Sequence, residues 1–346
     1  MKKILLLPAI FFTLLNYVKS QTFIDEDFEQ TGKLLFKVFA NFHLDVAGDE
    51  VNNSAFEIRR AYLGYAHDFN KKLTGQVIFD AGLNSQTNRY GAFLKIAGLT
   101  WRITDKFTIN GGLISPKQFK TQERFWGYRY LYKSYQDEYR FGYSADLGMT
   151  AEYVFNKYIL VDIGVLNGEG YKNINLDYGD FKGSAGVTIT PIDKIQFRVY
   201  YDIMNNNDTS LIDDYRQDQS TISFYLGAKI TDKFRLAGEY NYQKNHQNVN
   251  QHDLFGYSLY STYVFSKKFE LFGRADILLS NQLEGETEDW FYQKNGTGVL
   301  GGLQYAPIKG LKLALNYRHT IPNKPNEAPT PASNSFIYFN VEFKFN

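Results

Sequence analysis

The chain has 346 residues, no cysteine, a formal net charge of +1 and 17% aromatic residues, with a mean hydropathy of -0.38. A near-neutral charge does not suggest a nucleic-acid-binding or strongly charged membrane-surface protein, and the lack of cysteine excludes a disulfide framework. A chain can be both this aromatic and this polar when its strands alternate, with one face against an apolar environment and the other against water.

The N-terminus has the organisation of a secretory signal peptide. Two lysines precede an apolar stretch that ends at Val18, and the small residue Ser20 stands where a signal peptidase would cleave. A transmembrane anchor is the alternative, but about 15 apolar residues fall short of the roughly 20 that span a bilayer as a helix. We expect residues 1–20 to be the signal peptide, 21–33 a short periplasmic segment, and 34–346 the folded domain.

From residue 34 onward, apolar and polar residues alternate with a period of two, which is typical of strands and not of helices. The expected strands, bounded by the ends of their apolar faces, are 34–44, 56–65, 73–79, 92–96, 107–113, 147–155, 159–165, 181–189, 195–201, 222–230, 234–242, 255–265, 269–277, 299–305, 311–317 and 337–345. In the fourth, Ala92, Leu94 and Ile96 form the apolar face.

Short and long connections alternate between these strands. The short ones contain Asp, Asn or Ser beside Lys, as in ITDKF, which occurs at 103–107 and again at 230–234. About sixteen strands with short turns at one end and long loops at the other are typical of an outer-membrane, all-β, up-and-down antiparallel barrel. A soluble β-sandwich is the alternative, but it would bury the many mid-strand Lys and Arg residues, whereas a barrel exposes them to internal water.

The inner face of this barrel is expected to present cations to passing anions. The candidate pore-lining residues are Lys37, Arg59, Arg60, Lys95, Arg198, Arg235, Arg274 and Arg318. Acidic residues of the same parity are nearly as numerous, so we expect at most a mild anion preference. Opposite charges are expected to pair across strands, with Asp162 or Glu239 as a partner for Arg198.

The second strand, within AFEIRRAYLGYAHDF at 55–69, breaks its own alternation. Ile58 and Ala61 are both apolar but have opposite parity. One extra residue at Arg59 and Arg60, a β-bulge, restores the phase and turns both arginines into the lumen. The alternative leaves Arg60 on the lipid face, with its charged end extended toward the interface.

The connection at 116–143 is long and mixes aromatic with charged residues. Its basic residues are Lys117, Lys120, Arg124, Arg129, Lys133 and Arg140. A loop of this size is usually functional. Folded into the barrel, it would narrow the pore and offer fixed cations to anions, and a loop that stays on the surface is the alternative.

Catalytic and metal-binding chemistry find little support. Without cysteine, a nucleophile would be Ser or Thr activated by His, but the five histidines are scattered along the chain. His246 and His252 share one connection, yet no third ligand is spaced to complete a metal site. We therefore expect no cofactor, no metal and no enzymatic activity.

Two stretches, FEIRRAYLGY at 56–65 and SADLGMTAEYVFNKYILVDIGVLNGEGY at 144–171, resemble the phosphate-selective porin O and P family, as does the sixteen-strand layout. The resemblance implies a trimeric channel in the outer membrane of a Gram-negative bacterium, surrounded by lipid and lipopolysaccharide. It also implies that lumen arginines and constriction lysines attract phosphate. Arg59 and Arg60 match the first of these arginines in position and type.

We therefore predict a porin that allows passive diffusion of small hydrophilic solutes, anions such as phosphate among them. The alternative is a non-conducting outer-membrane barrel with a structural, secretion-linked or surface partner-binding role. Stable channel steps in a planar bilayer would distinguish the two.

Overall fold

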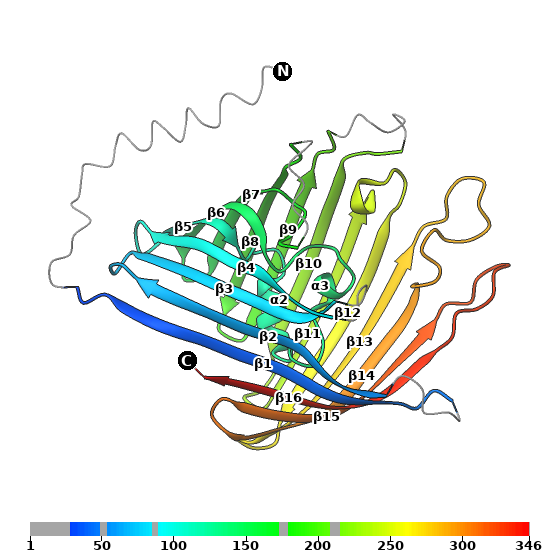
Figure 1. The fold of residues 1–346 in the computed structure, drawn as a ribbon. Coiled ribbons are helices and arrows are strands. Elements are labelled where there is room, and N and C mark those ends of the chain that lie inside the picture. The colour runs from blue at the N-terminus through cyan, green and yellow to red at the C-terminus, as the bar shows by residue number, and fades with distance from the viewer. Residues whose placement is uncertain (1–27, 49–53, 85–88, 173–178, 208–214, 346) are drawn as a thin grey trace.

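A closed barrel of sixteen antiparallel strands is found in the computed structural model, which describes residues 28–48, 54–84, 89–172, 179–207 and 215–345. The strands are β1 (Thr31–Asp45), β2 (Ala55–Asp68), β3 (Leu73–Asn84), β4 (Arg89–Arg102), β5 (Phe107–Ile114), β6 (Asp146–Asn156), β7 (Ile159–Leu166), β8 (Lys182–Ile192), β9 (Ile195–Met204), β10 (Gln219–Lys229), β11 (Phe234–Lys244), β12 (Leu254–Val264), β13 (Phe269–Ser280), β14 (Gly296–Ile308), β15 (Leu311–Pro322) and β16 (Asn334–Phe345). Neighbours in the chain pair, and β1 pairs with β16 to close the ring (Figure 1). The predicted fold class and strand number are confirmed.

The N-terminal boundary differs slightly from the prediction. β1 already contains residues 31–33, which were expected to belong to the periplasmic segment. The predicted signal peptide, 1–20, and the rest of that segment as far as residue 27 lie outside the described residues. Among the residues that the structure describes, no helix has both the length and the hydropathy needed to cross a membrane.

The two faces of the wall differ as a membrane barrel requires. Outward side chains are apolar and exposed, as shown by Phe56 at 85% and Leu315 at 57% exposure. Inward side chains are largely polar and buried, and Thr221, Asn241 and Asn340 are at most 1% exposed. Because every strand has neighbours on both sides, no backbone edge is left to face lipid.

The repeated sequence ITDKF forms the short turns between β4 and β5 and between β10 and β11. In the first, the Thr104 hydroxyl accepts hydrogen bonds from the backbone N–H groups of Lys106 at 3.2 Å and Phe107 at 3.0 Å. Thr231 does the same in the second, with 3.0 Å to the N–H of Phe234. In both copies the hydroxyl accepts from backbone donors of the turn, which explains why Thr recurs at this position.

The bulge predicted in β2 is present. Phe39 of β1 pairs with Arg60 and Ala40 pairs with Ile58, so Arg59 is the extra residue of β2. Arg60 then points into the lumen, where its guanidinium forms an ion pair. The alternative, with Arg60 on the lipid face, is wrong.

A second bulge, in β4, was not predicted. Ile78 of β3 pairs with Ile96 and Phe79 pairs with Leu94, so Lys95 is the extra residue. The bulge turns Ile96 inward, where it is 9% exposed and lines a cavity. The predicted outward orientation of Ile96 is therefore wrong, and the reason is this unrecognised change of phase.

Candidate functional site

Residues 116–143, here called the inner segment, lie within the ring of strands (Figure 1). The segment contains two short helices, α2 (Lys120–Trp126) and α3 (Tyr135–Glu138), in place of the predicted loop without helices. Its buried residues pack against inward aromatic residues of the wall, in a cluster that contains Trp126, Tyr128, Tyr130 and Leu131 with Phe39, Tyr225, Tyr260 and Phe272. Helices this short are not stable alone, so packing against the wall holds them.

Arg198, on β9, holds the beginning of the inner segment. Its guanidinium forms a two-bond ion pair with Asp162 at 2.6 and 3.0 Å. It also donates to the backbone carbonyls of Lys117 at 3.1 Å and Gln118 at 3.4 Å. The predicted pairing with Asp162 is confirmed. The Lys117 ammonium lies 2.7 Å from the Glu152 carboxylate on β6.

Arg274 and Arg318 hold the middle of the segment. Arg274, on β13, bonds Asp276 at 2.8 and 2.6 Å and donates to the carbonyl of Lys133 at 2.5 Å. Arg318, on β15, donates to the carbonyl of Leu131 at 2.9 Å. Both guanidinium groups therefore donate hydrogen bonds to backbone carbonyls of the inner segment. Fewer of their N–H groups are left to contact a solute.

Arg235, on β11, makes a similar contact near the end of α2. One of its terminal nitrogens lies 3.5 Å from the carbonyl oxygen of Trp126, and its guanidinium lies 5.7 Å from the centre of the Tyr128 ring. The Tyr128 hydroxyl in turn donates to the Glu270 carboxylate of β13 at 2.5 Å. Strand β6 and strands β9 to β15 thus carry polar contacts to the inner segment, and four of the predicted pore-lining arginines make such contacts.

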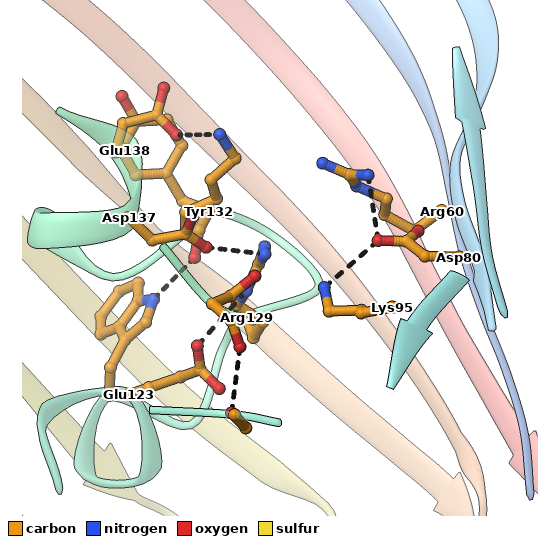
Figure 2. Close-up of polar contacts among 12 residues, drawn as sticks. Arg60, Asp80, Lys95, Glu123, Arg129, Tyr132, Asp137 and Glu138 are labelled. Atoms are coloured by element: carbon orange, nitrogen blue, oxygen red, sulfur yellow. Dashed lines mark hydrogen bonds and ion pairs between the residues drawn. The ribbon is translucent and has the colours of Figure 1, made fainter. Parts of the chain in front are cut away.

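The opposite wall carries a compact charge cluster at the two bulges (Figure 2). The Asp80 carboxylate, on β3, lies 3.1 Å from the Arg60 guanidinium and 3.2 Å from the Lys95 ammonium. The Tyr171 hydroxyl donates to the same carboxylate at 2.6 Å. Burial and the Asp80 charge raise the pKa of Tyr171, so this hydroxyl stays a donor. One carboxylate is shared by two cations, and the cluster retains a positive charge.

The inner segment faces this cluster with charges of its own (Figure 2). Arg129 lies 2.8 Å from Asp137 and 3.5 Å from Glu123, and Lys120 lies 3.3 Å from Glu123. Burial disfavours the charged form of Asp137, but the Arg129 guanidinium outweighs burial and holds the pKa of this carboxyl below its usual range. The Lys95 ammonium, on the wall, interacts electrostatically with the charges of both Arg129 and Asp137.

A cavity of about 400 Å³ lies between the inner segment and β1 to β4. Its charged lining residues are Lys37, Lys95, Lys120, Arg129, Lys344 and Glu123. With cations in excess, this gap has a positive potential, and its low-dielectric walls strengthen that potential.

The remaining predicted site residues do not line this cavity. Lys133 of the inner segment lies 3.8 Å from Glu138. Arg59 lies on the wall of a second cavity, on the side of β13 to β16. Arg124 and Arg140 are exposed, and neither forms an ion pair within the described part of the chain.

Asp80 and Tyr171 were not among the predicted site residues. Alternation along β3 places the Asp80 side chain on the inner face. If β3 is paired with β2 and β4 and both bulges are included, Asp80 lies beside Arg60 and Lys95. Tyr171 lies in a long connection between β7 and β8, where alternation carries no information about position.

Comparison with known proteins supports the architecture. Residues 143–345 match the family described as beta-barrel porin-2, OmpL-like. Residues 36–118 match the phosphate-selective porin O and P family, and they include the stretch FEIRRAYLGY on which the predicted resemblance partly rests. No curated protein sequence matches the chain.

Solved porin structures are similar in fold at low sequence identity. OprB of Pseudomonas putida is 8% identical, with a TM-score of 0.68 over 91% of this chain and 94% of its own. An anion-selective porin from Comamonas acidovorans is 10% identical, with a TM-score of 0.66 over 92% and 100%. The outer-membrane channel DcaP of Acinetobacter baumannii is 9% identical, with a TM-score of 0.64 over 91% and 97%.

The predicted porin family is thus confirmed, and porins are channels rather than enzymes. Since one family match covers more than half of the sequence and the fold agrees with it, the chain belongs to the beta-barrel porin-2, OmpL-like family, and it is an outer-membrane channel for small solutes.

Proposed function

We propose that this channel favours small anions, phosphate among them, and that they cross the barrel through the gap between the inner segment and β1 to β4. The inner segment would then be the constriction of the pore. The observation that carries the proposal is the sharing of Asp80 by Arg60 and Lys95, which leaves a net positive charge at the edge of the gap. Arg129 on the opposite side adds a cation whose charge Asp137 and Glu123 offset.

The roles of the predicted cations divide in this proposal. Arg60, Lys95, Lys37, Lys120 and Arg129 would contact the anion. Arg198, Arg235, Arg274 and Arg318 would act chiefly by holding the inner segment in place. This division favours a modest anion preference over a strong one, because most inner charges are paired within the protein.

Reversal potentials in a planar bilayer with a salt gradient test the proposal. Removing one charge about 6 Å from the ion changes the energy of that ion by about 0.7 kcal/mol in water-like surroundings, or roughly threefold in permeability. Lys95→Ala should therefore lower the anion-to-cation permeability ratio about threefold or more. Lys233→Ala, which removes the same charge from an exposed turn, is the matched control and should change nothing.

Two outcomes would contradict this proposal. A wild-type channel without anion preference would remove its basis, and a ratio unchanged by Lys95→Ala would show that ions pass elsewhere. Block of chloride current by phosphate tests the narrower proposal that phosphate is a solute.

We also propose that the barrel assembles as a homotrimer in the lipid and lipopolysaccharide of the outer membrane, after removal of residues 1–20. A similar solved structure, OmpT of Vibrio cholerae, is described as a trimer form at 12% identity. Light scattering of the purified protein in detergent would give the number of chains, and N-terminal sequencing would give the cleavage position. A monomer, or a mature chain that begins elsewhere, would contradict the corresponding part.

A further inference from the structure

A second cavity, of about 260 Å³, lies between the inner segment and β13 to β16, on the other side of the segment from the gap described above. Its charged lining residues are Arg59, Arg274, Arg318, Glu138 and Asp276. Asp276 is held by two bonds from Arg274, and Glu138 lies nearest to Lys133. The lining cations outnumber the lining carboxylates by three to two, and the charge of Glu138 also acts on Arg318.

Arg318 is nine-tenths buried, with an exposed fraction of 9%, and no carboxylate of the described residues lies within ion-pair distance of it. Its Nε donates to Asn316 at 3.0 Å, and one terminal nitrogen donates to the carbonyl of Leu131 at 2.9 Å. A guanidinium has five N–H donors, so three remain, including both hydrogens of the other terminal nitrogen. A buried cation without a counter-charge is costly unless an anion joins it.

Arg59 increases this cost. It lines the same cavity, its charge acts on Arg318, and its own carboxylate neighbour, Glu57, is 4.0 Å away, at the outer limit of an ion pair. Two like charges around one cavity repel each other unless a negative group lies between them. The cavity therefore has the charge of an anion site.

The walls indicate which kind of anion would fit. The Tyr338 ring lies 3.8 Å from the Arg318 guanidinium and the Tyr132 ring 5.2 Å from it. Leu300 and Phe336 add apolar surface. Rings that cover a guanidinium face leave its donors to act in the guanidinium plane, which suits the two coplanar oxygens of a carboxylate. The volume leaves room for an organic group against the apolar residues.

We propose that this cavity is a binding site for small organic carboxylates, with Arg318 and Arg59 on the carboxylate and the aromatic wall on the organic group. The proposal goes beyond the proposed function, because this cavity lies on the other side of the inner segment from the gap through which anions are proposed to pass. The carboxylate site should bind its ligand without any current through the channel. Binding and anion preference can therefore be tested separately.

Isothermal titration of the full-length protein in detergent with benzoate tests the site. Benzoate should bind saturably, whereas benzyl alcohol, which lacks the charge, and inorganic phosphate, which lacks the apolar ring, should each bind roughly tenfold more weakly or worse. Arg59→Ala and Arg318→Lys should each weaken benzoate binding by about tenfold or more. Arg102→Lys alters an exposed arginine at the end of β4 that does not line this cavity, so it is the matched control and should keep the wild-type affinity.

Arg59 is the decisive variant, because it makes no hydrogen bond to the inner segment and its loss need not move that segment. Wild-type affinity in Arg59→Ala, or no saturable benzoate binding at all, would overturn the proposal. Equal affinity for phosphate would overturn the role of the aromatic wall. If benzoate binds as expected but the reversal potential shows no anion preference, the site stands and the proposed function fails.

Discussion

The contact between Arg198 and the start of the inner segment can be removed without leaving a charge buried alone. Replacing Arg198 by Met and Asp162 by Asn together deletes both members of the ion pair and the donors to the backbone of Lys117 and Gln118. A hydrogen bond from a charged donor contributes about 1.5–3 kcal/mol. Because the bond to Gln118 is long, we take the lower end for each, about 3 kcal/mol in total. The displaced position of this part of the segment should then be populated roughly a hundredfold more often.

Single-channel recording measures the consequence. The double variant should show a larger conductance and more open-channel noise than the wild type, because a segment that leaves its place widens the passage. The matched control replaces the exposed pair Lys194 and Asp232, 3.9 Å apart, by Met and Asn. An exposed pair contributes little, so this control should behave as the wild type. Wild-type conductance and noise in a folded Arg198 and Asp162 variant would refute the anchoring role.

Three further changes have defined outcomes. Asp80→Asn removes the carboxylate charge that Arg60 and Lys95 share, so the anion-to-cation permeability ratio should rise about threefold, and an unchanged reversal potential would contradict it. Tyr128→Phe deletes the bond to Glu270 and should destabilise the fold by about 1–3 kcal/mol, seen as a lower denaturation midpoint. Burial lowers the pKa of His246 to about 4, so the stability that its neutral form supplies is present above the unfolded pKa of about 6.5 and is lost as the pH falls toward 4. After correction for the intrinsic pH dependence of amide exchange, the opening free energy of residues 245–253 should fall over that interval by at most about 3 kcal/mol. His246→Gln should reduce this dependence.

The barrel was largely predictable from the sequence, because alternation reports directly which side of a strand meets lipid. The break at Arg59 and Arg60 was recognised because apolar residues change parity after it. The same change occurs in β4, where Ala97 and Leu99 have the parity opposite to Ala92 and Leu94. It was missed because the apolar Ile96 at the junction continues the earlier pattern.

The use of the inner cations was much less predictable. Parity identifies Arg198, Arg274 and Arg318 as inward, but it cannot distinguish a cation that meets solutes from one that holds a backbone carbonyl. The partner carbonyls lie 80 to 187 residues away in the chain, and alternation within one strand carries no signal at that separation. The two short helices of the inner segment were missed for a related reason, since packing against the wall rather than local propensity stabilises them.

The long sequence separation of these contacts also bears on how the protein is made. Leu131 belongs to the first half of the chain, yet the arginine that binds its carbonyl is 187 residues further on, in the last strand but one. Closing so large a loop costs chain entropy, and the contact that offsets this cost cannot form until the late strands are in place. The bond to Leu131 can therefore form only after β15 has been added, whereas β6 and β9 can hold the start of the inner segment earlier.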